Sequence, residues 1–367
     1  MLIAGWIEPV LSTPLICQNI SSVQESVAKM SNIYSNILEI LNKIDSENKN
    51  REQILNADTN IRGNLYRSVI FPNTEKFIPI TARDGTTRLM PGNQNCYLFR
   101  GQTRDYPSCR AKIYRNSQDQ IDLLAARLRQ IEFEMVIREH AAVQGILKNG
   151  IHVSFAGLAQ HYELATEYLD VTSDPYVAAF FAVCRYSQTK RRYVPVANQD
   201  KKGVLMKTLA LVFSANQMSE SRLEILGLQP FPRPGNQKAY AVKLEKNEIF
   251  SAHKMFFHHN LKNSKRIYEL FDGGEKLFPS DPIQKKAQEI SEGKVFTHNA
   301  FDEVITRYGF SSSSDYYLQA LKQKCIEISN NCNSIFKFSE AELNQFSEDW
   351  ESNGKTEFSG QIVDHRG

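Results

Sequence analysis

An α+β fold, with a mixed sheet core and flanking helices, is predicted by two kinds of pattern in the sequence. Residues 95–101, 205–213 and 239–244 have the apolar, β-branched and aromatic character of core strands. Residues 22–44 and 119–148 have apolar side chains at steps of three and four, which places them on one face of an α-helix. Strands and long helices in one chain are typical of a sheet covered by helices.

The predicted helices differ in how they end. The helix over residues 22–44 is expected to be a packing element, followed over residues 45–60 by a loop or short helix that leads into the main domain. The helix over residues 119–148 ends at Asn149-Gly150, because glycine readily takes the left-handed conformation that terminates a helix. A strongly apolar helix is expected over residues 176–185.

The C-terminal third is also expected to be helical. Asp281-Pro282 is a good helix start, and Ser339 and Glu342 have the spacing of a capping box. These boundaries divide the chain into an N-terminal helical segment, a main domain and a C-terminal helical extension, over residues 1–75, 76–295 and 296–367.

Composition and charge indicate a soluble, cytoplasmic protein. The chain has 44 basic and 41 acidic residues, a net charge of +3, so a nucleic-acid or membrane surface would have to be a local feature. The six cysteines are scattered without a CxxC pair, which suggests neither a disulfide framework nor a zinc site and fits a reducing compartment. The N-terminus does not resemble a signal peptide, and no apolar run approaches the roughly 18 to 20 residues that span a bilayer.

The first segment with chemical character is Tyr97-Leu98-Phe99-Arg100-Gly101-Gln102. A strand ends there with an arginine, and the following glycine would let a ligand approach the backbone closely. Arginine grips phosphate through two parallel hydrogen bonds. The competing interpretation is a strand-end arginine that pairs with a core carboxylate.

The second segment runs from Gly157 to Pro175 and combines a histidine with polar residues before the apolar helix. Thr172 and Ser173 precede Asp174-Pro175, so one side chain can cap the helix while a neighbouring hydroxyl faces a ligand. Capping is the favoured role for Asp174. His161 is either a general base or a core histidine, with the structural role slightly favoured.

The third segment, residues 233–240, is a tight loop that delivers Gln237 at the start of a strand. Its side chain either serves the site or hydrogen-bonds the neighbouring loop. Three histidines at 253, 258 and 259 are conceivable ligands of a hydrolase or nuclease, but their interleaving with apolar residues favours strand packing.

In this order the three segments resemble the FRG-domain family of bacterial proteins, whose pattern runs from F-R-G-Q through A-Q-H-Y and L-D-x-T-S-x-P to R-x-x-x-Q and L-F-P-D. The resemblance covers roughly residues 95–290. It is carried by Phe99 to Gln102, Ala159 to Tyr162, Leu169, Asp170, Thr172, Ser173, Pro175, Ala178 to Ala182, Arg233, Gln237 and Leu277-Phe278-Pro279. The departures are Glu163, Ala165, Glu167 and Val171, where the family usually has glycine, proline, arginine and tryptophan.

The aromatic-Arg-Gly strand and the Thr-Ser pair before a helix also look like ADP-ribosyltransferases. That resemblance implies an ADP-ribosyltransferase-like fold and NAD as the substrate. Arg100 would hold its phosphates, Thr172 and Ser173 would brace the nicotinamide ribose, and Tyr97 or Tyr162 would stack on nicotinamide. Gly101, Gln102 and His161 are expected to line the same nucleotide groove.

The resemblance places Gln237 where these enzymes have a glutamate that stabilises the oxocarbenium-like transition state. A neutral amide can hydrogen-bond the ribose but cannot act as a base, so Asp170, Glu163 and Glu167 are candidate substitutes. If Gln237 occupies the catalytic position, Gln237→Glu is expected to raise turnover.

Two main functions therefore stand open, and both expect the three segments to meet in one cleft. The first is an NAD-dependent ADP-ribosyltransferase or NAD glycohydrolase, acting as a toxin or phage-defence effector on an acceptor, protein or nucleic acid, that the sequence does not specify. The second is a non-catalytic nucleotide or nucleic-acid sensor that uses the same Arg100 groove. The missing glutamate and the basic run Lys190-Arg191-Arg192 favour the second.

Overall fold

The structure is a computed structural model. It describes residues 33–57, 77–81, 85–91, 97–115, 119–197, 202–214, 222–227, 231–331 and 333–362, without the side chains of residues 51–57 and 211.

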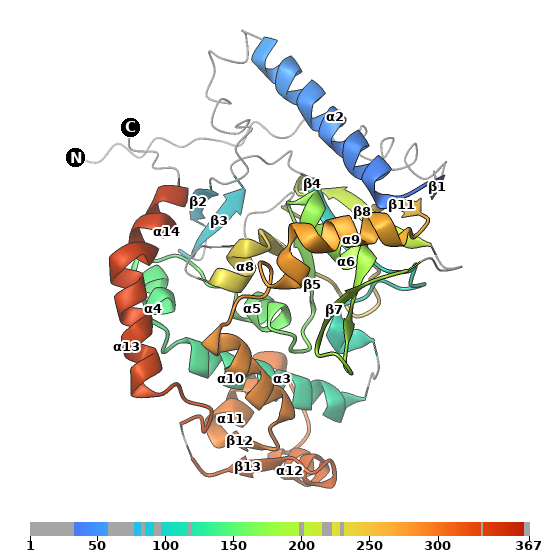
Figure 1. Ribbon diagram of the computed structural model, residues 1–367. Coiled ribbons are helices and arrows are strands. Elements are labelled where there is room, and N and C mark those ends of the chain that lie inside the picture. The colour runs from blue at the N-terminus through green and yellow to red at the C-terminus, as the bar shows by residue number, and fades with distance from the viewer. Residues whose placement is uncertain are drawn as a thin grey trace, which may run out of the picture.

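A mixed seven-stranded sheet forms the centre of the protein (Figure 1). Its strands, in spatial order, are β1 (Ile33–Tyr34), β11 (His253–Phe257), β8 (Gly203–Leu209), β4 (Tyr97–Gln102), β5 (Tyr168–Thr172), β10 (Ala239–Lys243) and β9 (Leu223–Ile225). The β1 and β11 strands pair in parallel, and the other neighbours pair antiparallel. The α+β class and the mixed sheet predicted from the sequence are thus confirmed.

Helices cover both faces of this sheet, because its central strands alternate between two apolar cores. Phe99 of β4 and Leu205 of β8 belong to one core, whereas Leu98 and Met206 belong to the other. The first core is completed by α2 (Ile37–Ala57), α6 (Pro175–Val183) and α9 (Leu261–Leu270). The second is completed by α3 (Gln120–Ile137), α4 (Ala141–Lys148), α5 (Phe155–His161), α10 (Pro282–Glu292) and the C-terminal helices.

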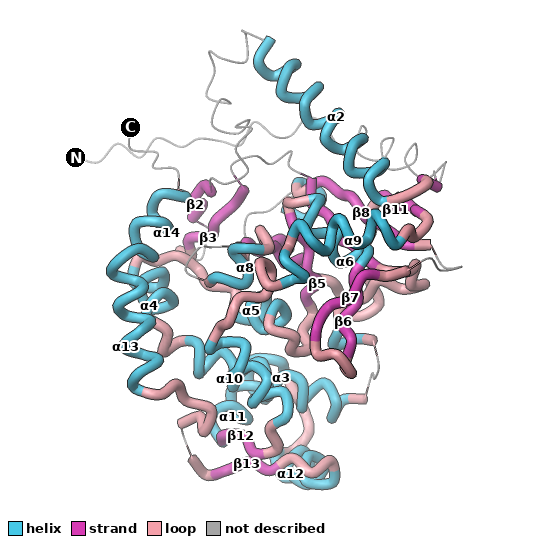
Figure 2. Tube along the Cα trace, in the orientation of Figure 1, coloured by secondary structure: helices cyan, strands magenta, loops and turns pink. Residues whose placement is uncertain are grey.

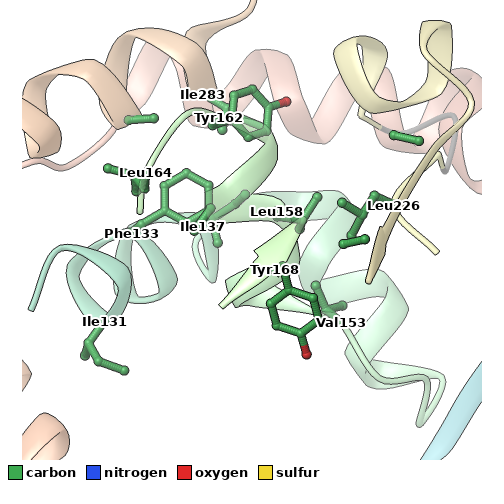
Figure 3. Close-up of a cluster of buried hydrophobic side chains, with 14 of the residues drawn as sticks. Ile131, Phe133, Ile137, Val153, Leu158, Tyr162, Leu164, Tyr168, Leu226 and Ile283 are labelled. Atoms are coloured by element: carbon green, nitrogen blue, oxygen red, sulfur yellow. The ribbon is translucent and has the colours of Figure 1, made fainter. Parts of the chain in front are cut away.

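The second core is the larger one, and Figure 3 shows part of it, where Phe133 and Ile137 of α3 meet Leu158 of α5 and Leu164. Tyr162 and Tyr168 send their hydroxyls away from this cluster in different directions. Burying a large apolar side chain contributes about 1.5 to 3 kcal/mol, so the face that carries α3 and α5 holds most of the packing energy.

Shorter elements surround the two cores (Figure 2). Three two-stranded sheets consist of β2 (Phe77–Thr81) with β3 (Thr87–Pro91), β6 (Cys184–Ser187) with β7 (Arg192–Pro195), and β12 (Val295–Thr297) with β13 (Glu327–Ser329). The remaining helical elements are η3 (Lys112–Tyr114), α7 (Leu211–Ser214), α8 (Pro232–Asn236), η5 (Asp272–Gly274), α11 (His298–Tyr308), α12 (Ser314–Gln323), α13 (Glu340–Asp349), the π-helical turn η6 (Trp350–Gly354) and α14 (Lys355–Gln361).

The sequence explains α6 and its tight fit against β4. Asp174 caps the helix by accepting from the backbone N–H of Tyr176 at 2.8 Å, and Pro175 supplies the first turn. A Cβ atom at Gly101 would lie 1.8 Å from the carbonyl oxygen of Ala178. The sequence predicted that Gly101 lets a ligand approach the backbone closely, but α6 occupies that position.

The predicted helix over residues 119–148 is wrong in one respect, because it is two helices. His140 caps α4 by accepting from the backbone N–H of Ala142 at 3.1 Å, and its ring stacks on Phe346 at 4.1 Å. Burial of the ring lowers the pKa of His140 to about 4, which keeps it neutral and able to accept that bond. Apolar periodicity continues across the break and gave no sign of it.

Other boundaries also differ. The α2 helix begins at Ile37 and runs to Ala57, through most of the segment predicted as a loop or short helix, while residues 22–32, 58–60 and 95–96 of the predicted elements lie outside the described residues. The predicted strand 205–213 ends at Leu209 and is followed by α7, and the turn-rich stretch before Gln237 contains α8. Both C-terminal caps are confirmed: Asp281 caps α10, and Ser339 with Glu342 forms a capping box.

The terminal segments pack onto the main domain. The β1 strand extends the central sheet, and Trp350 joins the second core so closely that a Cβ atom at Gly145 would lie 2.5 Å from its ring. Within the described ranges, no helix is long and apolar enough to cross a membrane.

Candidate functional site

A group of polar side chains lies where β4 and β5 separate. The β4 strand pairs with β8 along its whole length, from Tyr97 to Gln102, but with β5 only at Phe99 and Thr172. Next to that single pair, Arg100 donates through Nη1 to the backbone carbonyl of Asp170. We call Arg100, Gln160, His161 and Asp170 the polar wedge.

Asp170 is the only carboxylate of the polar wedge. It accepts a hydrogen bond from Gln160 Nε2 at 3.1 Å, and its Oδ1 atom lies 3.6 Å from His161 Nδ1. Burial raises its pKa, but His161, the charge of Arg100 and the Gln160 bond outweigh burial and hold the pKa of Asp170 below its ordinary value. Asp170 is therefore ionised at neutral pH. Its side chain is 35% exposed, and Oδ1 has no hydrogen-bond partner among the described residues.

The Arg100 guanidinium supplies the positive charge. Its Nε atom is buried and, within the part of the chain that the structure describes, has no acceptor. Arg115 interacts with it electrostatically, since burial and then the charge of Arg100 lower the pKa of Arg115. Two interacting cations thus accompany one carboxylate oxygen that has no hydrogen-bond partner among the described residues.

His161 is not a satisfied core histidine. Its side chain is 4% exposed, yet neither ring nitrogen has a hydrogen-bond partner among the residues described. A buried polar group without a partner costs about 1 to 3 kcal/mol, and His161 has two such atoms where each other described residue of this kind has one.

A second set of motif residues has a structural role. Arg233 forms an ion pair with Glu163 at 2.9 Å, and its guanidinium lies over the Tyr162 ring at 5.5 Å and the Phe278 ring at 4.9 Å. The Tyr162 hydroxyl donates to the Asp281 carboxylate, the residue that caps α10. These contacts fasten residues 278–281 to α5 and α8.

Thr172 and Gln237 belong to the same set. The Thr172 hydroxyl donates to the backbone carbonyl of Gln237 at 2.7 Å and accepts from the backbone N–H of Asp174 at 3.0 Å. The Gln237 side-chain amide donates to the carbonyl of Leu277 at 2.8 Å. We call Tyr162, Thr172, Arg233 and Gln237 the motif clamp, because their polar atoms hold neighbouring segments together.

The three carboxylates proposed as substitutes for a glutamate now differ. Glu167 forms a buried ion pair with Arg127, and Glu163 is held by Arg233. Of the three, only Asp170 has a buried oxygen without a hydrogen-bond partner among the described residues. The sequence could not distinguish these three carboxylates, because the partners of Glu163 and Glu167 lie far away along the chain.

The remaining candidates lie around the polar wedge without joining it. Tyr97 is on the opposite face of β4 from Arg100, under Lys207 Nζ, which lies 3.8 Å from the ring centroid. The Ser173 backbone N–H donates to the Lys238 carbonyl at 3.3 Å. Gln102 contacts the Cys109 sulfur at 3.7 Å through Nε2, and its buried Oε1 has no partner among the described residues.

An open pocket of about 620 Å³ lies at the carboxyl end of β5, and the sequence did not predict it. It is lined by Asp174, Tyr176, Asn236, Leu270, Phe271, Lys276 and Leu277. Its lining comes from α6, α8, α9 and the segment after η5, which no local pattern connects. Two further polar residues, Gln160 of the polar wedge and Arg115, were not predicted from the sequence as members of the site. Gln160 stands inside the A-Q-H-Y motif and could have been found there, whereas Arg115 carries no sequence signal.

No cluster of three or more metal-ligating side chains occurs in the described ranges. His253 is in β11, as the strand interpretation of that segment predicted, and His259 Nε2 lies 2.8 Å from the carbonyl of Thr103.

Comparison with known proteins supports one of the two resemblances. Residues 95–191 match the family model described as the FRG domain. This stretch contains β4, the polar wedge and α6. No curated protein and no solved structure matches the chain significantly.

Proposed function

Because residues 95–191 form an FRG domain, which contains the whole polar wedge, we propose that this domain binds NAD there and cleaves it, as an ADP-ribosyltransferase-like enzyme. The observation that carries the proposal is the buried Oδ1 of Asp170, which accepts no hydrogen bond from a described residue, beside a guanidinium whose Nε has no acceptor among the described residues.

The pairing of charges suits a nucleotide. Arg100 and the neighbouring Arg115 can neutralise a diphosphate, because guanidinium groups bind phosphate oxygens through paired hydrogen bonds. The ionised Asp170 can accept from ribose hydroxyls, which are hydrogen-bond donors. A nucleotide offers both an anion for the guanidinium groups and a diol for the carboxylate.

The same carboxylate suits cleavage of the glycosidic bond. As the bond between C1′ of the ribose and the pyridinium nitrogen breaks, its electron pair stays with that nitrogen, and neutral nicotinamide leaves. Positive charge develops on the ribose, and an ionised Asp170 stabilises it by about 3 kcal/mol. Water or an acceptor then adds to C1′ and loses a proton. An ADP-ribosyltransferase-like fold is part of this proposal, and the mixed sheet with helices on both faces supports it.

The test is release of nicotinamide from NAD by the purified protein. Asp170→Asn keeps the size of the side chain and is expected to lower turnover about 100-fold or more. Asp315→Asn, an exposed aspartate in the first turn of α12, is the matched control and should leave turnover unchanged. NAD binding without nicotinamide release would favour the non-catalytic nucleotide sensor instead. The absence of both NAD binding and nicotinamide release would refute the NAD-cleaving enzyme and the NAD sensor alike.

The proposal extends to a toxin or phage-defence role. Strong induction in a bacterial host should then slow growth, and it should lower cellular NAD or modify a macromolecule. The same induction of the Asp170→Asn protein should do neither. If wild-type induction changed neither growth, NAD nor any macromolecule, this role would be abandoned.

A further inference from the structure

A basic surface lies on α9 and on the β6–β7 hairpin, although the chain as a whole is nearly neutral. Residues 184–196 and 258–268 contain no aspartate or glutamate. Their exposed cations are Arg185, Lys190, Arg191, Arg192, Lys262, Lys265 and Arg266. None of these seven forms a salt bridge with another described residue. The uncompensated charge is therefore concentrated in two segments.

The two segments form one surface. The β7 strand packs against both α9 and η5, and Figure 1 shows the hairpin beside α9. On α9, Lys262, Lys265 and Arg266 lie on the outward side, because Ser264 and Ile267 between and after them are buried. Tyr186 of the hairpin is 48% exposed and adds an aromatic ring to the same region.

This surface borders the open pocket of about 620 Å³. Leu270 and Phe271, at the C-terminal end of α9, line the pocket together with Tyr176 of α6. The charge of Arg266 acts on Tyr176, opposing the hydrogen bond that the Tyr176 hydroxyl donates to Asp45, which raises the pKa of Tyr176 to about 12. The helix that carries three of the cations therefore ends at the pocket.

The nearest acids offset only part of the positive charge. Asp45, which accepts from the Tyr176 hydroxyl at 2.7 Å, keeps its negative charge, whereas Asp174 lies 3.5 Å from Lys238 Nζ. Asp272 pairs with Lys276 at 3.1 Å, which leaves Glu269 at the end of α9 as the one acid on the outward side of that helix.

We propose that this surface binds single-stranded nucleic acid, with the phosphates along α9 and the hairpin and one base in the pocket. Unpaired lysines and arginines bind phosphates with release of counterions. A pocket with apolar and aromatic walls accepts a base that is free of a duplex, and Asn236 and Asp174 lie in its lining to contact the base edges. A membrane surface would use the cations but not the recessed pocket.

The experiment is fluorescence anisotropy of labelled single-stranded DNA and RNA oligomers, about 12 nucleotides long, at several salt concentrations. Each cation that contacts a phosphate contributes about −0.7 to the slope of log affinity against log salt. The triple variant Lys262→Gln, Lys265→Gln and Arg266→Gln should bind at least about ten-fold more weakly, with a slope shallower by about 2. Leu270→Ala should weaken binding without changing the slope.

The matched control is Lys148→Gln, Lys294→Gln and Lys322→Gln, three exposed lysines on other surfaces, which should bind as the wild type does. Tight binding of either DNA or RNA supports the proposal, and the preferred sugar identifies the partner. Three results would overturn it: no binding at low salt, equal losses in both triple variants, or binding to phosphatidylserine vesicles but not to oligomers. Because binding is measured without turnover, a failure here leaves the NAD proposal for the polar wedge untouched.

Discussion

His161 Nδ1 lies 3.6 Å from Asp170 Oδ1, and neither atom has a hydrogen-bond partner among the residues that the structure describes. This separation is slightly longer than a hydrogen bond. The histidine and aspartate are therefore held beside each other but are not satisfied by each other, in a domain that elsewhere fastens its motif residues closely.

His161→Phe should raise the thermal midpoint and weaken nucleotide binding. Replacing a buried, unsatisfied ring by an apolar one of similar shape removes a desolvation cost of about 1 to 3 kcal/mol. Functional sites often trade stability for activity in this way. Thermal unfolding and nucleotide titration of the same sample check both effects. A lower midpoint would instead identify His161 as part of the scaffold.

Glu163→Gly should be at least as stable as Glu163→Ala, although glycine usually destabilises. Glu163 has a left-handed backbone, with φ of 72°, where the FRG pattern usually has glycine. Both variants lose the ion pair to Arg233, and only glycine relieves strain of about 1 kcal/mol. Urea denaturation measures the difference. At exposed Lys322 of α12, the matched control, alanine should be the more stable by about 1 kcal/mol. If the alanine variant were more stable than the glycine variant at both positions, there would be no backbone strain at Glu163.

Glu224 should make stability fall as pH rises towards neutrality. Burial raises the pKa of Glu224 to about 7 from 4.5, although Arg88 lies 2.9 Å away and opposes the shift. The folded protein thus holds the proton more tightly than the unfolded chain does. Stability from this group is full below about pH 4.5 and is lost as pH rises to about 7.

The measurement is the free energy of unfolding at several pH values for the wild type and Glu224→Gln. The variant cannot titrate at this position, so its stability relative to the wild type should increase between about pH 4.5 and 7 and then stay constant. Exposed Glu327→Gln should show no such trend. Parallel curves for the wild type and Glu224→Gln would exclude the raised pKa.

Gln237→Glu should lower stability and should not raise turnover, contrary to the expectation from the sequence. The buried Gln237 amide donates to the Leu277 carbonyl at 2.8 Å, and a glutamate would place a carboxylate against that oxygen. Gln237→Met, which removes the donor without adding charge, should cost only about 1 to 3 kcal/mol. Nicotinamide release and thermal midpoints separate the two ideas. A rise in turnover for Gln237→Glu would restore the catalytic interpretation of this position.

Features that depend on neighbours in the sequence could be predicted, and those that depend on distant partners could not. The Asp174-Pro175 cap and the Ser339–Glu342 capping box are local and are confirmed. The break at His140 depends on burial against Phe346, about two hundred residues further along the chain. In the same way, the FRG motif could be found by pattern, but which of its residues form the clamp depended on the segment at Leu277.

If Arg100 and Asp170 bind a ligand and do not merely support the sheet, calorimetric titration of ADP-ribose into the Arg100→Lys protein should show weaker binding. Lysine keeps the charge but loses the planar fork that holds two phosphate oxygens. We predict a dissociation constant at least about ten-fold weaker than that of the wild type, which corresponds to about 1.4 kcal/mol, with a thermal midpoint within a few degrees. Arg185→Lys, an exposed arginine of β6, should not change ADP-ribose affinity. Unchanged affinity with a much lower midpoint for Arg100→Lys would show that Arg100 supports the sheet and does not bind the nucleotide.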